Sequence, residues 1–115
     1  MVEFAFLTRE LRTLCEQDTA AHARLGPAVA ATFRRRLADL EAASHIFELP
    51  VGNVRLDPSY SDGSVCLLDL EDGWQLRFRA GHAALPLGQD GRVDWLSVSR
   101  IQIMELLSPD GAQHG

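Results

Sequence analysis

The stretch Asp69-Leu70-Glu71-Asp72-Gly73-Trp74-Gln75-Leu76-Arg77-Phe78-Arg79 decides the fold class of this 115-residue chain. Asp72-Gly73 is a strong signal for a tight hairpin turn. After the turn, apolar and polar side chains alternate, which predicts a strand with one buried face and one open face. Because strands joined by a tight turn run antiparallel, we expect residues 65–70 and 74–79 to pair.

The segments before this hairpin predict a strand and two helices. Residues 2–7 alternate like a short half-buried strand, and Thr8 offers a helix N-cap. An apolar stripe predicts a first helix from Arg9 to about Arg24, and Gly26-Pro27 supplies a stop and a new start. In the second helix, the apolar residues recur at helical spacing, which indicates that one face is buried. These residues are Val29, Phe33, Leu37 and Leu40.

The remaining segments predict further strands. A short strand is expected at 54–56 and a last strand at 99–107, with Ile101 and Ile103 toward the core. Between them, residues 81–95 form a long loop, and residues 110–115 a short flexible tail. The sequence thus predicts one α+β domain, residues 1–109, with two N-terminal helices packed on one face of a small twisted antiparallel sheet.

Composition limits the possible functions. The net charge of −5 argues against binding nucleic acid by bulk electrostatics, although all 11 basic residues are arginine, whose planar guanidinium holds phosphates bidentately. Cys15 and Cys66 have no metal-ligand spacing around them, so we expect buried free thiols, no metal and no cofactor. No apolar run is long enough to cross a membrane and no secretory signal opens the chain, so we expect a cytoplasmic protein.

The polar face of the sheet is the most informative surface. If the hairpin strand and the last strand are neighbours, Arg77, Arg79 and Arg100 converge there, and Arg55 joins them. Such a cluster predicts a local cationic patch on an acidic protein. The alternatives are a charged sheet surface without a function or, for Arg55 and Arg100, cross-strand pairing with carboxylates.

Three segments resemble HigB-like killer proteins of the RelE/ParE toxin superfamily. They are residues 36–43 (RLADLEAA), 69–78 (DLEDGWQLRF) and 90–105 (DGRVDWLSVSRIQIME), and the similarity covers about residues 9–107. The resemblance implies a toxin that cuts messenger RNA in the ribosome without a metal. It also implies neutralisation by a cognate antitoxin, expected to be a small helix-turn-helix protein.

The chain departs from the family pattern at three places. Val54-Arg55-Leu56 stands where the family has a His followed by an acidic residue and Leu. Gln75 follows Trp74 where the family has Arg, and Arg77 shares its strand face. The closing Asp-Tyr-His of the family is replaced by Ser108-Pro109-Asp110. A proton acceptor or donor is therefore missing from the expected set.

Candidate site residues follow from the resemblance and from the face that each residue occupies. The alternative interpretations are solvated surface for His82 and for the helix arginines, and packing at the domain edge for Tyr60. The catalytic candidates are Arg77, His82 and Arg55; the RNA-binding candidates are Arg79, Arg100 and Tyr60; the partner-binding candidates are Arg34, Arg35 and Arg36.

Three functions compete at this point. The first is a ribosome-dependent mRNA endonuclease toxin. The second is a catalytically degenerate binding protein that engages an antitoxin or another protein without cutting RNA. The third is gyrase poisoning, as in the ParE branch of the superfamily. The missing His, Gln75 and the acidic net charge favour the second function, whereas the family resemblance favours the first.

Overall fold

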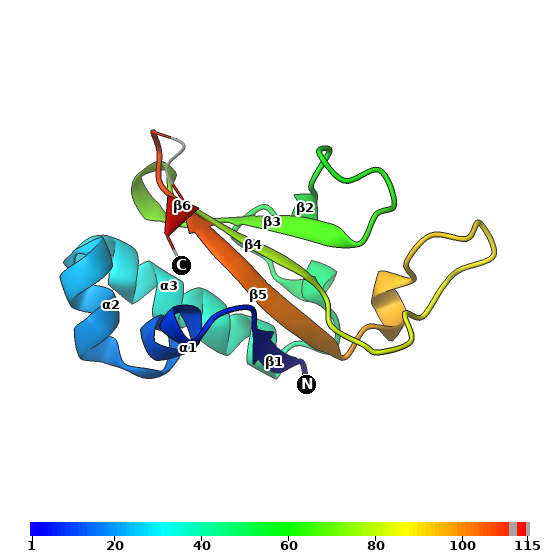
Figure 1. Ribbon diagram of the computed structural model, residues 1–115, viewed down its shortest axis with the longest axis horizontal. Helices are drawn as coiled ribbons and strands as arrows, with labels where there is room; N and C mark the ends of the chain where they lie inside the picture. The colour runs from blue at the N-terminus through cyan, green and yellow to red at the C-terminus, as the bar shows by residue number, and fades with distance from the viewer. Residues whose placement is uncertain (111–112, 115) are drawn as a thin grey trace.

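The computed structural model describes residues 1–110 and 113–114 and has an α+β fold in which helices pack against an open sheet (Figure 1). The strand order is β1-β5-β4-β3-β2, and β6 also pairs with β5. The helices are α1 (Arg9–Glu16), α2 (Asp18–Leu25) and α3 (Pro27–Ala42). The strands are β1 (Glu3–Phe6), β2 (Arg55–Leu56), β3 (Val65–Asp69), β4 (Gln75–Ala80), β5 (Arg100–Leu107) and β6 (Gln113–His114).

The helical segment before Gly26 differs from the prediction. Thr8 caps α1 as expected, since its side chain accepts a hydrogen bond from the Leu11 N–H at 3.1 Å. The single helix expected from Arg9 to Arg24 is wrong, because Gln17 adopts an extended backbone and separates α1 from α2. The break lets α1 contact β1 and β5 while α2 packs on α3. A single straight helix over these residues could not make both sets of contacts.

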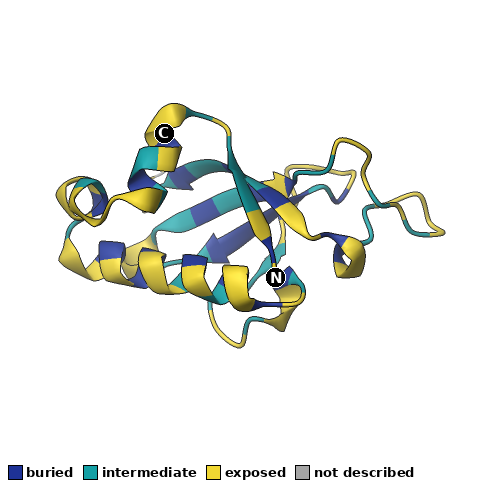
Figure 2. Ribbon diagram, turned by 90° about the horizontal axis from the view of Figure 1, so that it is seen from below, coloured by how far each residue is buried: buried dark blue, intermediate teal, exposed yellow. Residues whose placement is uncertain are grey.

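The predicted stop and start at Gly26-Pro27 is confirmed. Gly26 has a φ of +82°, which favours glycine, and Pro27 opens α3. The expected stripe of α3 is buried, with Phe33 only 1% exposed. Figure 2 shows the buried residues of α3 turned toward the sheet and its exposed residues turned outward. This helix therefore covers the core face of the sheet.

The hairpin that decides the fold is also confirmed. β3 and β4 pair antiparallel, and the turn between them places Asp72 and Gly73 at φ values of 55° and 79°. Leu76 and Phe78 point into the core and are fully buried. The opposite face, which carries the alternate residues of β4, is called the outer face below.

The expectation of a purely antiparallel sheet is wrong, because β1 runs parallel to β5. A β-bulge is a second difference: Arg77 pairs with Glu105 and Phe78 with Ile103, which leaves Met104 as an extra residue in β5. Simple alternation from Ile101 and Ile103 would turn Glu105 toward the core. The bulge instead turns Glu105 to the outer face, opposite Arg77.

Within the expected tail, Gln113–His114 forms β6, while Gly111, Ala112 and Gly115 lie outside the described residues. Among the described residues, no helix is long and apolar enough to cross a membrane. The connections β2–β3 and β4–β5 extend from the same end of the sheet (Figure 1).

Candidate functional site

Arg77 lies at the centre of a cluster of charged side chains on the outer face. Its Nε donates to Asp57 Oδ2 at 2.8 Å, and its Nη1 donates to Glu105 Oε1. Its guanidinium also lies 5.7 Å from the centre of the Tyr60 ring, close enough for a cation–π contact. Asp57 and Tyr60 come from the β2–β3 connection, which therefore folds over the outer face. We call Asp57, Tyr60, Arg77 and Glu105 the Arg77 cluster.

The three charged side chains of the Arg77 cluster are largely closed to solvent, whereas Tyr60 is 37% exposed. The side chains of Arg77 and Glu105 are 16% and 15% exposed, and that of Asp57 only 2%. Burial lowers the pKa of Arg77, but the hydrogen bonds and charges of Glu105 and Asp57 outweigh this effect and raise the pKa above its ordinary value. The expectation that Arg77 lies on an open cationic face is therefore wrong, because two carboxylates already neutralise it.

Arg55 is also held by a carboxylate. Its Nη1 lies 3.1 Å from Asp69 Oδ1 and donates to the Asn53 carbonyl at 2.9 Å. Gln75, which stands where the resemblance calls for Arg, donates from Nε2 to the same Asp69 oxygen at 3.3 Å. Asp69 thus accepts hydrogen bonds from side chains on both neighbouring strands, β2 and β4. The alternative of cross-strand pairing with a carboxylate is confirmed for Arg55.

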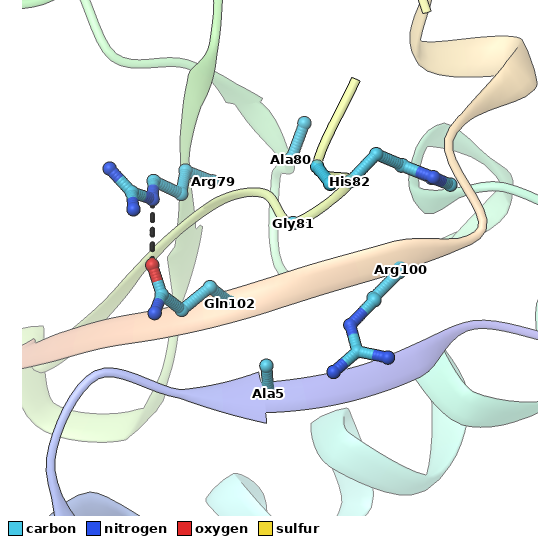
Figure 3. A pocket seen from close by; sticks show the side chains of 8 residues that line it. Ala5, Arg79, Ala80, Gly81, His82, Arg100 and Gln102 are labelled. Atoms are coloured by element: carbon cyan, nitrogen blue, oxygen red, sulfur yellow. Dashed lines mark hydrogen bonds between the residues drawn. The ribbon is translucent and has the colours of Figure 1, made fainter. Parts of the chain in front are cut away.

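Arg79 and Arg100 do come together, and they line one hollow on the outer face. The hollow measures about 510 Å³ and opens over the ends of β4 and β5 and the middle of β1. Gln102 and Ala5 lie opposite each other in the register of β5 and β1, between the two arginines (Figure 3). We call this site the outer-face hollow; it is lined by Ala5, Arg79, Ala80, Gly81, His82, Ala83, Arg100 and Gln102.

The residues that line the hollow keep it open. Ala5, Ala80 and Ala83 have no side chain beyond Cβ, and Gly81 has none. At Gly81, an added Cβ would lie only 3.0 Å from the Ile101 carbonyl carbon, because the Gly81 N–H donates to the Arg100 carbonyl at 2.7 Å. The close approach of β4 and β5 therefore favours glycine here and leaves space above the backbone.

The positive charges of Arg79 and Arg100 are less neutralised by nearby carboxylates than the charge of Arg77 is. Arg79 is exposed and donates from Nε to the neutral amide oxygen of Gln102 at 2.7 Å. Arg100 lies 3.8 Å from Glu3, and both side chains are exposed, with Arg100 at 49%. An exposed pair at this distance is screened by water and contributes little. The hollow can therefore attract an anionic group such as a phosphate.

His82 lines the hollow, but its ring is engaged elsewhere. Its Nε2 accepts a hydrogen bond from the Ser99 N–H at 3.0 Å. Figure 3 shows the imidazole pointing away from both Arg79 and Arg100. A nitrogen whose lone pair is already occupied cannot also take a proton from a substrate, so this geometry does not support the catalytic role assigned to His82.

The three consecutive helix arginines do not form one surface. Arg34 lies 2.9 Å from Asp18, and Arg35 donates to the Thr32 hydroxyl at 3.2 Å. Arg36 does not fit the alternative of a solvated surface, because its side chain is only 16% exposed and lies close to the Gly52 backbone. Successive helix residues point about 100° apart, so the triplet is divided between different neighbours.

The sequence pattern did not identify the residues that decide which arginines can bind a ligand. Asp57 lies in a turn-rich segment, and no periodicity signals that it will be buried. Glu105 reaches the outer face only through the bulge at Met104. The hydrogen bond between Gln102 and Arg79 depends on strand register, which the sequence pattern does not give. In the part of the chain that the structure describes, no three His, Cys, Asp or Glu side chains gather in a way that could hold a metal ion.

No family model, no curated protein and no solved structure matches this chain.

Proposed function

We propose that this protein is a binding protein of the RelE/HigB toxin type, which holds phosphate groups of RNA in the outer-face hollow without cutting the RNA. Arg79 and Arg100 bind the phosphates, and Gln102 orients Arg79. The observation that carries the proposal is the contrast between two kinds of arginine on one sheet face. Arg77 is neutralised by two carboxylates, whereas Arg79 and Arg100 flank an open hollow.

The contacts of the expected catalytic residues support the proposal that the protein does not cut RNA. Arg77 and Arg55 are paired with carboxylates, and His82 accepts a backbone hydrogen bond. Attack by a ribose 2′-hydroxyl needs a group to accept its proton and a cation to stabilise the phosphorane. Among the three catalytic candidates, none is positioned to do either while these contacts persist.

The proposed partner is a cognate antitoxin, expected to be a small helix-turn-helix protein. An acidic segment of that protein would compete with RNA for the outer-face hollow, because both present anionic oxygens to Arg79 and Arg100. The ribosome and its mRNA are the proposed source of the RNA. Harmless expression of verified, soluble protein at high level would favour this binding-only proposal, whereas growth arrest that the antitoxin relieves would favour a toxin.

The direct test is RNA binding measured by fluorescence anisotropy with a labelled single-stranded oligonucleotide. We expect measurable binding by the wild type at low salt and a strong loss in the Arg79→Ala/Arg100→Ala double variant. If each arginine contacts one phosphate, the slope of log Kobs against log salt falls by about 1.4 in the double variant, because each contact to a single strand contributes about 0.7.

A matched control separates the hollow from total charge. Arg24 is exposed on α2 and pairs with Glu10, so Arg24→Ala removes a positive charge far from the outer face. This variant is expected to bind RNA like the wild type. Equal binding by the wild type and the double variant would exclude the outer-face hollow as the RNA site. Cleavage of the oligonucleotide, or of mRNA in ribosomes, would contradict the binding-only proposal.

A ribosome-dependent endonuclease remains the second candidate, and one observation favours it. The Arg77 cluster brings a carboxylate, Glu105, beside a guanidinium and the Tyr60 ring on the outer face. Displacing Glu105 from Arg77 would provide a proton acceptor next to a cation. Under this candidate the wild type cuts mRNA in ribosomes and Glu105→Gln abolishes cutting, while Glu48→Gln, an exposed carboxylate outside the cluster, has no effect.

A further inference from the structure

The sheet ends at β1, and the outward edge of this strand is not paired by any segment that the structure describes. The Glu3 N–H donates to Ser99 and the Leu7 N–H to Ile103, so these groups point toward β5. Because backbone direction alternates along a strand, the N–H and C=O groups of Phe4 and Phe6 point away from β5. Figure 2 looks onto this edge, with β1 in front and no described strand across it.

Both sides of this edge are hollowed. One groove of about 800 Å³ lies between β1 and the helices α1 and α3, and it contains Phe4 and Phe6. A second hollow of about 400 Å³ lies along β1 and the start of α1, and Arg9, Arg12 and Arg100 contribute to its lining. Met1 and Leu7, at the two ends of the edge, are 82% and 53% exposed. An unpaired edge with apolar flanks is a template for pairing with another strand.

The free backbone groups select one pairing register with a second copy of the same strand. An antiparallel pair uses residues whose N–H and C=O groups both point toward the partner, so Phe4 pairs with Phe6 and Phe6 with Phe4 of the second copy. A register centred on Phe4 would instead require the N–H of Val2, which already donates to the Glu41 carbonyl at 3.2 Å. A register centred on Phe6 would require the carbonyl of Thr8, which already accepts the Arg12 N–H at 3.2 Å. In the selected register Ala5 lies opposite itself on the two-fold axis, where strands approach closely and a small side chain fits.

Charge is arranged in a complementary way along the edge. Glu3 lies at the start of β1 and is exposed, whereas Arg9 follows its end and is also exposed. In the selected register Glu3 lies opposite Leu7 of the second copy, and Arg9 of that copy follows two residues further along the chain. No carboxylate in the described part of this chain pairs with Arg9, so its charge is available to Glu3 across the two-fold axis. The same contact occurs twice by symmetry.

We propose that β1 is a homodimer interface, in which the β1 strands of two copies pair antiparallel and join the two sheets into one. The pairing brings Phe4 of each copy directly opposite Phe6 of the other, and such aromatic cross-strand pairs are stabilising. The outer-face hollows of the two copies then lie on the joined sheet on either side of the two-fold axis. The dimer depends on no part of the proposed RNA binding.

The test is the oligomeric state of the full chain, measured by sedimentation velocity from about 1 to about 500 µM, because dimer population depends on concentration. We expect the wild type to dimerise, and Ala5→Lys, which places two like charges opposite each other on the axis, to weaken association at least about tenfold. Ala31→Lys, on the exposed side of α3, adds the same charge elsewhere and is expected to dimerise like the wild type.

A charge exchange tests the register. Glu3→Arg places like charges next to Arg9 and weakens the dimer, whereas Glu3→Arg/Arg9→Glu restores opposite charges and returns the dissociation constant to within about threefold of the wild-type value. A wild type that stays monomeric across the whole concentration range overturns the proposal. So does a dimer that tolerates Ala5→Lys. If Ala5→Lys dissociates the dimer but the Glu3→Arg/Arg9→Glu variant does not regain the wild-type dissociation constant, the dimer uses β1 in a different register.

Discussion

The guanidinium of Arg77 lies 2.8 Å from the carboxylate of Asp57, a residue whose side chain is almost completely buried. The pair joins β4 to the connection that follows β2, and Asp57 Oδ1 in turn accepts the Ser59 N–H at 2.9 Å. Removing one partner of such a pair leaves the other as a buried charge without compensation. The main role of Arg77 is therefore to stabilise the fold by compensating the buried charge of Asp57.

The first prediction follows directly. Arg77→Ala is expected to lower the free energy of unfolding by about 3 to 5 kcal/mol, because Asp57 stays buried without its cation. Arg79→Ala, at an exposed position two residues further along β4, is expected to change it by less than about 0.5 kcal/mol. Urea titration followed by circular dichroism measures both. Similar small losses for the two variants would show that Asp57 does not need Arg77.

The second prediction concerns the core between α3 and the sheet. Phe33 is 1% exposed, so Phe33→Ala is expected to cost about 3 to 5 kcal/mol through lost burial and the cavity left behind. Denaturant titration against the wild type measures the difference. A loss below about 1 kcal/mol, the range of ordinary surface substitutions, would place Phe33 outside the core.

The third prediction concerns the position where the family resemblance calls for Arg. In Gln75→Arg, the new guanidinium is expected to pair with Asp69, which already accepts from Gln75 and Arg55. Neither the wild type nor this variant should therefore cut mRNA in a ribosome-dependent cleavage assay, provided that both are folded. Cleavage by Gln75→Arg alone would show that the missing arginine is what prevents catalysis.

The fourth prediction is a pH dependence of stability. Burial, and secondarily the charge of Asp57, raises the pKa of the Cys66 thiol from 9.0 to about 12. The thiol then favours the folded state fully below pH 9, and this contribution is lost as the pH rises from 9 toward 12. At pH 10 the loss amounts to about 1.4 kcal/mol.

Comparing the unfolding free energies of the wild type and Cys66→Ala between pH 8 and pH 10 isolates this term, because the variant lacks the thiol at every pH. The difference between the two proteins is expected to shrink as the pH rises. A constant difference across this range would show that Cys66 titrates alike in the folded and unfolded states.

The sequence by itself determined the elements whose signals are local. The Asp72-Gly73 turn specified the hairpin of β3 and β4, Thr8 and Gly26-Pro27 set helix boundaries, and the spacing of apolar residues identified the buried face of α3. Each of these depends on backbone preferences or periodicity within a few residues. The resemblance to RelE and HigB toxins, and the function that it implies, stays a prediction.

Only the tertiary structure decided which arginines are available to a ligand. The bulge at Met104 turned Glu105 to the outer face, and the β2–β3 connection brought Asp57 to the same guanidinium from 20 residues away in the chain. Strand order placed β1 beside β5, which opened a hollow between Arg79 and Arg100 and, among the described residues, left the outward edge of β1 without a paired strand. These outcomes depend on register and long-range packing, because the charge that a side chain presents is set by the neighbours that the fold brings to it and not by its own position in the sequence.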